Sequence, residues 1–440
     1  MDKSTLVSLL KENGIVGAGG AGFPTYAKID ERAETIIMNC CECEPLLKLH
    51  RQLLEKDTRE ILNAFEVIRE TVGAKEAVIG IKEAYVTTVQ AIKQIIGEFP
   101  HIRIAELEEV YPAGDEVVLI YEVTKKVVRP GGLPIESGIA VFNVETVYNL
   151  AQAMKGKPVT EKLVSVVAEV NRPVTVRVPI GMPLQEVVSL AGGSTIKDPV
   201  YLVGGPMMGR ILPPTETVTK TTNAILVLPP DHYLIERKLS NNKINLKRAA
   251  ASCCQCSMCT DLCPRHLLGH PIEPHLLMRA AICKDIQHTE AFVNTFFCCG
   301  CGLCELYSCF QGLAPRTLIQ EVKNGLRAAG VKPPVVQAAP VSPAREGRKA
   351  PIERLMARID LSKYDRPAPL EEDLKPCKEV RILLSQHIGA PAVPVVRQGD
   401  RVSAGTMIAQ PGNGLSVAIH ASIDGMVTQV TDKYIRITQN

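Results

Sequence analysis

The sequence contains no tryptophan, and aromatic residues occupy only 4% of its 440 positions. Hydrophobic residues still reach 46%, which is enough to form cores packed from aliphatic side chains. No apolar run approaches the roughly 18 residues of a membrane-spanning helix. The opening residues, MDKSTLVSLLKENG, lack the basic start, apolar core and cleavage site of a secretory signal. We therefore expect a soluble, cytoplasmic protein with no membrane span.

Neither sign of charge is in excess. The chain has 50 Lys and Arg residues against 47 Asp and Glu residues, a formal net charge of +3. This near balance provides no electrostatic attraction for nucleic acid or an anionic membrane, so no nucleic-acid partner is expected. A chain of this length predicts roughly three domains.

Cysteine, in contrast, is abundant, with 15 residues. The run 253–264, CCQCSMCTDLCP, contains C-x2-C-x2-C-x3-C-P, the bacterial spacing for cubane iron–sulfur clusters. The run 298–309, CCGCGLCELYSC, repeats C-x2-C-x2-C and places Cys309 after four further residues. Without an export signal, such spacing indicates a reducing cytosol and two clusters.

The spacing also predicts which cysteines share a cluster. Three thiolates on a tight loop can each bind a different iron of one cube, and the fourth iron needs a ligand from further away. In two-cluster ferredoxins the other motif supplies that ligand. We therefore predict two [4Fe-4S] clusters with crossed ligation. The first is assigned to Cys253, Cys256, Cys259 and Cys309, and the second to Cys298, Cys301, Cys304 and Cys263.

Two zinc sites or a disulfide framework are the alternatives. Zinc usually takes two C-x2-C pairs separated by a longer insert, and disulfide frameworks suit small secreted chains. The ferredoxin spacing favours clusters over both. Cys254 and Cys299 fall out of register with the motifs and are interpreted as spectators.

The amino-terminal third alternates helical and strand patterns. Apolar spacing predicts a short helix over 5–11, one long helix over 46–72 and a third helix over 84–96. Strands are predicted over 34–39, 77–81 and 102–105. This alternation indicates an α/β domain with a parallel sheet, which places ligands at the carboxyl ends of its strands.

A glycine-rich stretch, GAGGAGFPT at 17–25, precedes the first of these strands. Such a backbone can approach a ligand closely and direct N–H groups at phosphate, although a plain turn is an equal alternative. Pro24 keeps the stretch from matching the dinucleotide G-x-G-x-x-G in a strand–turn–helix setting.

Several motifs now recur in a known order: GAGGAGFPTYAK, a strand ending in Asn39 followed by ECEP, YPAGDE at 111–116, GGLP at 131–134 and FNVET at 142–146. This set resembles the flavin-binding subunit of respiratory complex I and, more closely, its relative in Rnf-type complexes. The resemblance implies bound FMN and NADH as electron donor. By motif, the flavin would be lined by Gly17, Gly19, Gly20, Gly22, Lys28, Asn39, Tyr111, Gly114, Asn143 and Thr146. Phe23, Glu44, Asp115 and Glu116 would face the nicotinamide, with Glu44 and Glu116 as catalytic residues.

One position departs from that pattern. The complex I subunit carries an acidic residue where Cys41 stands in this chain. Cys40, Cys41 and Cys43 are too crowded to chelate a metal alone, and we interpret them as packed or incidental thiols, with a redox role beside the flavin as the alternative.

The rest of the chain resembles modules of the same relatives. The segment 171–212 resembles the β-grasp soluble-ligand-binding domain, for which ligand binding and a plain spacer role both remain open. Recurrent proline predicts a linker over 331–376 without packed helix or sheet, apart from a short helix near 352–359. QGDRVSAGTMIA, followed by ASIDG, resembles the barrel-sandwich fold of lipoyl and biotinyl carriers. No lysine stands between Gly405 and Gly425, which excludes a swinging arm and leaves a structural or docking role.

The barrel-sandwich module lies at the amino end of Rnf flavin subunits and at the carboxyl end of cobalamin reductases of the propanediol-utilisation (PduS) family, so the domain order resembles the latter. That resemblance implies NADH-dependent reduction of cob(III)alamin and cob(II)alamin towards cob(I)alamin in a bacterial microcompartment. Its partners would be a corrinoid or its adenosyltransferase, and the shell or another electron-transfer protein. The alternatives are an Rnf-like subunit that reduces ferredoxin or another reductase, and a flavin-free iron–sulfur relay.

The predicted fold class is therefore an α/β flavin-binding domain, a β-grasp module, an α-helical two-cluster ferredoxin-like domain and an all-β barrel-sandwich domain. The expected boundaries are 1–165 for FMN and NADH binding, 166–230 for the β-grasp module, 231–330 for the clusters, 331–376 for the linker and 377–440 for the barrel sandwich.

Overall fold

The computed structural model describes residues 1–283 and 287–439. In its amino-terminal lobe, β3 (Ile102–Leu107), β2 (Glu76–Lys82), β1 (Thr35–Cys40) and β5 (Ile139–Asn143) form a parallel sheet in that order. The register pairs Asn39 with Gly80 on one side and with Asn143 on the other. The predicted parallel sheet is confirmed, and its carboxyl edge carries both asparagines.

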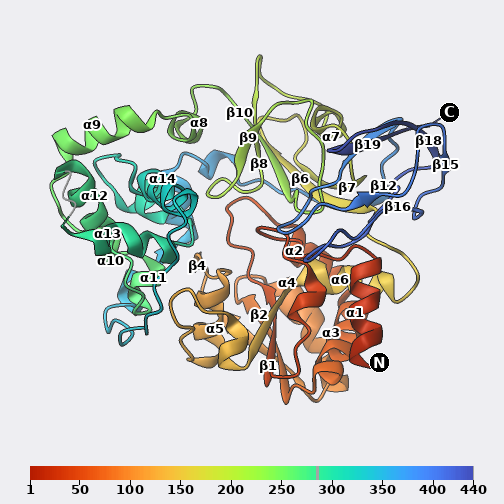
Figure 1. Cartoon of the computed structure of the whole chain (residues 1–440), viewed down its shortest axis with the longest axis horizontal. Coiled ribbons are helices and arrows are strands. Elements are labelled where there is room, and N and C mark those ends of the chain that lie inside the picture. The colour runs from red at the N-terminus through yellow and green to blue at the C-terminus, as the bar shows by residue number, and fades with distance from the viewer. Residues whose placement is uncertain (284–286, 440) are drawn as a thin grey trace.

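Helices cover both faces of this sheet (Figure 1). They are α1 (Lys3–Glu12), α2 (Leu49–Lys56), α3 (Thr58–Val72), α4 (Val86–Ile95), α5 (Glu116–Thr124) and α6 (Val144–Ala153), with the short strand β4 (Val110–Tyr111) before α5. The single long helix predicted over 46–72 is wrong, because the chain leaves helical geometry at Asp57. There the hydroxyl of Thr58 donates to the Leu54 carbonyl at 2.7 Å, a local bond that competes with helix continuation.

The second lobe is built on a mixed sheet in the order β12-β7-β6-β10-β8-β9. Its strands up to β10 are β6 (Glu161–Ala168), β7 (Val174–Pro179), β8 (Val200–Val203), β9 (Arg210–Leu212) and β10 (Ala224–Leu228), with α7 (Leu184–Leu190) after β7. The expected boundary at residue 165 falls inside β6, which the sheet assigns to this lobe.

The segment 331–376 is folded onto the other lobes. It forms β11 (Ala350–Pro351), α15 (Ile352–Arg358) and β12 (Leu370–Leu374). β11 pairs with β4, and β12 extends the second sheet by pairing with β7 in parallel. The absence of packed sheet expected here is therefore wrong. β12 itself contains no proline, so its backbone N–H groups remain available for pairing with β7.

Helices dominate the lobe that carries the cysteine motifs. They are α8 (Tyr233–Lys238), α9 (Asn242–Ser252), α10 (Met258–Asp261), α11 (Pro264–Leu267), α12 (Pro274–Cys283), α13 (Thr289–Val293) and α14 (Pro315–Ala328). The lobe lies beside β4 and α5 of the amino-terminal lobe, with α11 towards them (Figure 1). Throughout 1–283 and 287–439, no helix combines the length and apolar character of a membrane span.

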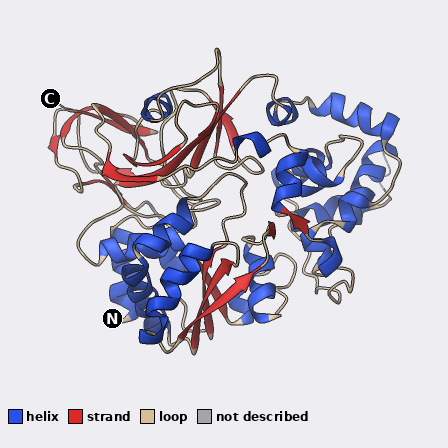
Figure 2. Ribbon diagram, turned by 180° about the vertical axis from the view of Figure 1, so that it is seen from behind, coloured by secondary structure: helices blue, strands red, loops and turns tan. Residues whose placement is uncertain are grey.

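The carboxyl-terminal lobe is made of strands and lies at the opposite end of the molecule from the helical lobe (Figure 2). One antiparallel sheet has the order β13-β19-β18-β15, and a smaller one has the order β14-β16-β17. The strands are β13 (Glu379–Leu383), β14 (Val393–Pro394), β15 (Arg401–Val402), β16 (Met407–Gln410), β17 (Ile419–His420), β18 (Gly425–Val430) and β19 (Tyr434–Thr438). Val380, Ile382 and Ile435 are fully buried between them. The all-β prediction for this region is confirmed.

Candidate functional site

The carboxyl edge of the parallel sheet gathers most of the residues predicted to line the flavin. The Asn39 amide donates to the Gly114 carbonyl at 2.9 Å, which ties the end of β1 to the YPAGDE turn. Asn143 ends β5 and caps α6, because its side chain accepts from the Glu145 N–H at 2.9 Å. The Thr146 hydroxyl accepts from the Ala18 N–H at 3.0 Å and so holds the glycine loop against α6.

The glycine loop presents unused backbone donors at this edge. It is closed by a hydrogen bond from the Gly17 N–H to the Phe23 carbonyl at 2.8 Å. Among the described residues, the N–H groups of Gly19, Gly20 and Ala21 have no protein acceptor. Gly20 has φ +67°, and a Cβ there would meet no atom within 4 Å. Free N–H groups beside open space fit the phosphate of FMN.

Lys28 and Glu116 lie together at the same edge. The Lys28 ammonium is 2.9 Å from a Glu116 carboxylate oxygen and donates to the Val141 carbonyl at 2.9 Å. It also lies 5.9 Å from the centre of the Phe23 ring. Lys28, predicted as the cation beside the flavin, is thus neutralised by Glu116, which was predicted as a catalytic residue.

Glu44 reaches out of the amino-terminal lobe into the second one. Its carboxylate accepts from the Met207 N–H at 2.8 Å and the Met208 N–H at 2.9 Å. Burial raises the pKa of Glu44, and the two donors oppose that rise. A Cβ on Gly205 would lie 2.1 Å from the Glu44 carboxyl, so only glycine permits this approach. The turn between β8 and β9 therefore holds this carboxylate.

Tyr111 and Asp115 instead contact the helical lobe. The Tyr111 hydroxyl donates to the Cys301 carbonyl at 2.5 Å. One Asp115 oxygen caps α5, and the other pairs with Arg265 at 2.8 Å, two residues after Cys263. The YPAGDE motif is therefore bound directly to the loops of the second predicted cluster.

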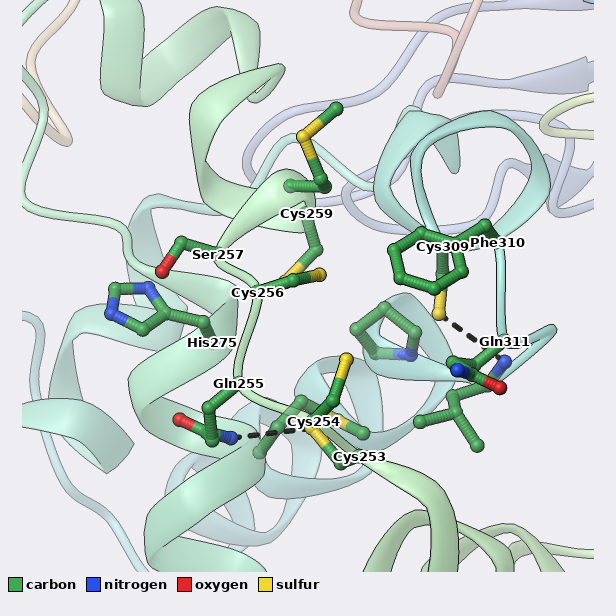
Figure 3. Close-up of a pocket in the computed structure, with 14 residues that line it drawn as sticks. Cys253, Cys254, Gln255, Cys256, Ser257, Cys259, His275, Cys309, Phe310 and Gln311 are labelled. Carbon is green, nitrogen blue, oxygen red and sulfur yellow. Dashed lines mark hydrogen bonds between the residues drawn. The ribbon is translucent and has the colours of Figure 1, made fainter.

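The structure brings the two predicted sets of cysteines together in two separate cavities. The first is lined by Cys253, Cys256, Cys259 and Cys309, with His275 and Phe310 beside them (Figure 3). The second is lined by Cys263, Cys298, Cys301 and Cys304. Each cavity thus combines three cysteines of one motif with the last cysteine of the other. This grouping fits the donor set of a four-iron cluster in each cavity, and the ligand assignment stays a prediction.

Burial and backbone N–H groups set the environment of the predicted ligand thiols. Burial raises the pKa of Cys259 and that of Cys263 to about 12, so cluster assembly has to displace protons from thiols. The Gly300 N–H lies 3.3 Å from the Cys298 sulfur, and the Leu313 N–H lies 3.4 Å from the Cys309 sulfur. Over the described ranges, no three His, Cys, Asp or Glu side chains converge to hold a single metal ion. A cube does not need such convergence, because each thiolate binds a different iron.

The remaining cysteines are distributed around these sites. Cys40 and Cys41 are buried and Cys43 is half-buried, as expected of packed thiols. Cys254 also lines the first cavity and Cys299 the second, outside the predicted ligand sets.

The cations around the second cavity did not emerge from the sequence analysis. Arg265 and Arg316 line it, and the buried Lys323 donates to the Cys298 carbonyl at 2.8 Å. The first cavity is lined by neutral side chains and His275. The one sequence signal for a cation at the second cavity was Arg265, which directly follows Cys263 and Pro264.

Four segments of the chain match known families. Residues 10–152 match the Nuo51 FMN-binding domain, 163–211 the SLBB domain, 252–314 the 4Fe-4S dicluster domain and 364–440 the RnfC barrel sandwich hybrid domain. These matches confirm the predicted FMN and iron–sulfur cofactors.

Relatives that align with this chain identify its family. The chain is 29% identical to one subunit of the Na(+)-translocating ferredoxin:NAD(+) oxidoreductase complex of Acetobacterium woodii, over 61% of this chain and 59% of that protein. It is 38% identical to the cobalamin reductase PduS of Citrobacter freundii, over 99% of this chain and 97% of that protein. Its identity to the protein of the same name from Salmonella typhimurium is 40%, over 97% of this chain and 94% of that protein. Such identity over nearly the whole of both chains shows that this protein belongs to the cobalamin reductase PduS family.

Proposed function

We propose that this protein is an NADH-dependent oxidoreductase that reduces cob(III)alamin and cob(II)alamin towards cob(I)alamin. The names of the two full-length relatives support the corrinoid as acceptor. The observation that carries the electron-transfer role is the direct contact between the YPAGDE motif and the second cysteine cavity, through Tyr111 with Cys301 and Asp115 with Arg265.

The residues divide the task by their positions. The glycine loop, Asn39 and Asn143 would hold FMN, and the two sets of cysteines would hold the clusters. Bound FMN would accept two electrons as hydride and release them singly, which matches the one-electron capacity of each cluster. The turn that contains Met207 holds Glu44 in place. The ion pair of Lys28 and Glu116 lies beside Phe23 of the glycine loop.

The position of the cavities supports an order for the two cluster sites. The second cavity contacts the flavin-binding lobe, and Cys301 and Cys304 in it are buried. At the first cavity, Cys254 and Cys256 are exposed, and Phe310 beside them is 58% exposed. We therefore place the second cluster on the flavin side and the first where the acceptor docks.

We also propose that the protein reduces its acceptor in or on a bacterial microcompartment, with the adenosyltransferase or the shell as partner.

Anaerobic purification followed by cofactor extraction and NADH titration tests this function. We expect FMN and two clusters in each chain, bleaching of the flavin by NADH, and NADH-dependent formation of cob(I)alamin from cob(III)alamin. A flavin-free protein with intact clusters would instead indicate an iron–sulfur relay. Reduction of ferredoxin but not of corrinoid would favour the Rnf-like alternative.

The charge of Arg265 should set the potential of the second cluster. Reduction adds an electron to a thiolate-bound cluster, and a nearby cation stabilises that added charge. We expect Arg265→Met to lower the potential of this cluster and Asp115→Asn to raise it, since Asp115 offsets the arginine. A change of about 1.4 kcal/mol corresponds to about 59 mV for one electron. Redox titration monitored by electron paramagnetic resonance gives the values, and equal potentials in all variants would refute the role. The exposed Arg279→Met is the control.

A further inference from the structure

A buried lysine lies at the edge of the sheet where the flavin site is proposed. Lys82 is the last residue of β2, and its side chain is among the most buried of the described residues, at 2% exposure. Register pairs Asn39 with Gly80 and Cys40 with Ile81, and Lys82 follows beside the chain where it leaves β1 after Cys40. Side chains alternate along a strand, which puts Lys82 on the same face as Gly80. That face is covered by Leu119 of α5.

Within the described ranges, the Lys82 ammonium has neither a hydrogen bond nor an ion pair. Its nearest aromatic neighbour is the Tyr85 ring, whose centre is 5.7 Å away. Burial lowers the pKa of Lys82, and the charges of Cys43, Cys41, Glu109 and Glu42 only oppose that change without contacting the ammonium. Leaving an ammonium unpaired in the interior carries a free-energy cost, because no protein group replaces its lost hydration. An anionic ligand at this edge would remove that cost.

Other buried lysines of the chain are paired. Lys162 forms an ion pair with the buried Glu145. Lys220 donates to the Gly14 carbonyl at 2.7 Å and to the Ala418 carbonyl at 3.0 Å. Among the described residues, Lys82 differs from both in having no protein acceptor, which indicates that its partner comes with the ligand.

We infer that Lys82 binds the pyrimidine end of the flavin ring, at N1 and the C2 carbonyl. This inference rests on the proposed flavin function. The free N–H groups of the glycine loop lie beside Asn143 at β5, where a Cβ on Gly19 would be 3.5 Å from that side chain. β1 separates β5 from β2, so Lys82 stands two strand spacings away, about 10 Å. Phosphate and ring lie at opposite ends of FMN. A phosphate bound by the glycine loop would therefore direct the ring towards Lys82.

The pyrimidine end of the flavin ring would also supply the negative charge that the Lys82 ammonium lacks among the described residues. Bound FMN would accept from C4 of NADH a hydride, one proton with two electrons, at N5, and NAD+ would leave. The reduced ring would then carry a negative charge at N1 and the C2 oxygen. An ammonium at that position binds reduced FMN more tightly than oxidised FMN and raises the flavin potential. Lys82 is thus a flavin-binding residue that favours electron acceptance from NADH.

Lys82→Met tests this inference because methionine keeps the length and removes the charge. We expect the variant to bind reduced FMN about tenfold more weakly relative to oxidised FMN, which for two electrons lowers the flavin potential by about 30 mV. The flavin-free protein should be as stable as the parent or more so, since the desolvated charge is gone. Lys82→Arg should recover the potential. Lys93→Met is the matched control, because Lys93 is an exposed lysine paired with Glu106 on the surface.

The outcomes are separable by comparing FMN with riboflavin, which lacks the phosphate. A ring contact predicts that Lys82→Met weakens both reduced ligands alike. Loss of FMN binding with riboflavin binding intact would place Lys82 at the phosphate and overturn the assignment to the ring. An unchanged potential with flavin bound would overturn it as well. A parent protein that binds no flavin at all would instead contradict the proposed function.

Discussion

A Gly20→Val protein should contain both clusters and no FMN. Gly20 has φ +67°, a conformation that costs a side-chain-bearing residue roughly 1–2 kcal/mol. The two methyl groups of valine would also fill the open space beside the free N–H groups of the loop. We therefore expect NADH to reduce nothing in this variant, while dithionite still reduces the clusters directly. Flavin content and the two reductions are measured on the same sample.

Gly73→Val separates loss of the flavin site from backbone strain. Gly73 has φ +73° at the end of α3, and a Cβ there also meets no atom within 4 Å. The two substitutions therefore impose a similar backbone penalty, but only Gly20 belongs to the loop. The control should retain FMN and NADH-driven reduction. If Gly20→Val behaved like the control, the loop would be an ordinary turn and the proposed flavin site would be wrong at its central motif.

Local patterns predicted the parts of the site that depend on neighbouring residues. The cysteine spacing grouped the first three thiols of each motif, because a tight loop determines where its thiols point. The last cysteine of each motif was assigned to the other cavity from the two-cluster ferredoxin pattern, and the cavities do bring these residues together. The strand ending at Asn39 likewise placed a polar loop at the sheet edge, because parallel strands share one carboxyl edge. Motif spacing and strand pattern were sufficient to predict these parts of the site.

Contacts between distant segments were beyond such reasoning. Asp115 and Arg265 are 150 residues apart, and nothing in either motif indicates that they pair. The binding of Glu44 by the Met207 and Met208 amides depends on how two lobes pack. Proline frequency in 331–376 indicated an unpacked linker, yet β12 finds an open edge at β7 that a local composition cannot reveal.

Crossed ligation predicts that Cys263→Ser removes the cluster of the other motif. Cys263 belongs to the first motif in sequence, but it lines the second cavity with Cys298, Cys301 and Cys304. Each four-iron cluster accounts for half of about eight irons per chain. Cys256→Ser and Cys263→Ser should therefore each leave about four irons, yet they should abolish different clusters. The paramagnetic spectrum of each variant identifies the cluster that remains.

The double variant Cys256→Ser, Cys263→Ser decides between the two arrangements. Under crossed ligation the two changes affect different clusters, so the protein should retain almost no iron. If each motif bound its own cluster, both changes would affect the same one, and about four irons would remain. Cys309→Ser combined with Cys301→Ser gives the reciprocal test, because Cys309 lines the first cavity and Cys301 the second. Cys254→Ser is the control, since this exposed thiol lies at the first cavity outside both predicted sets and its loss should leave all the iron in place.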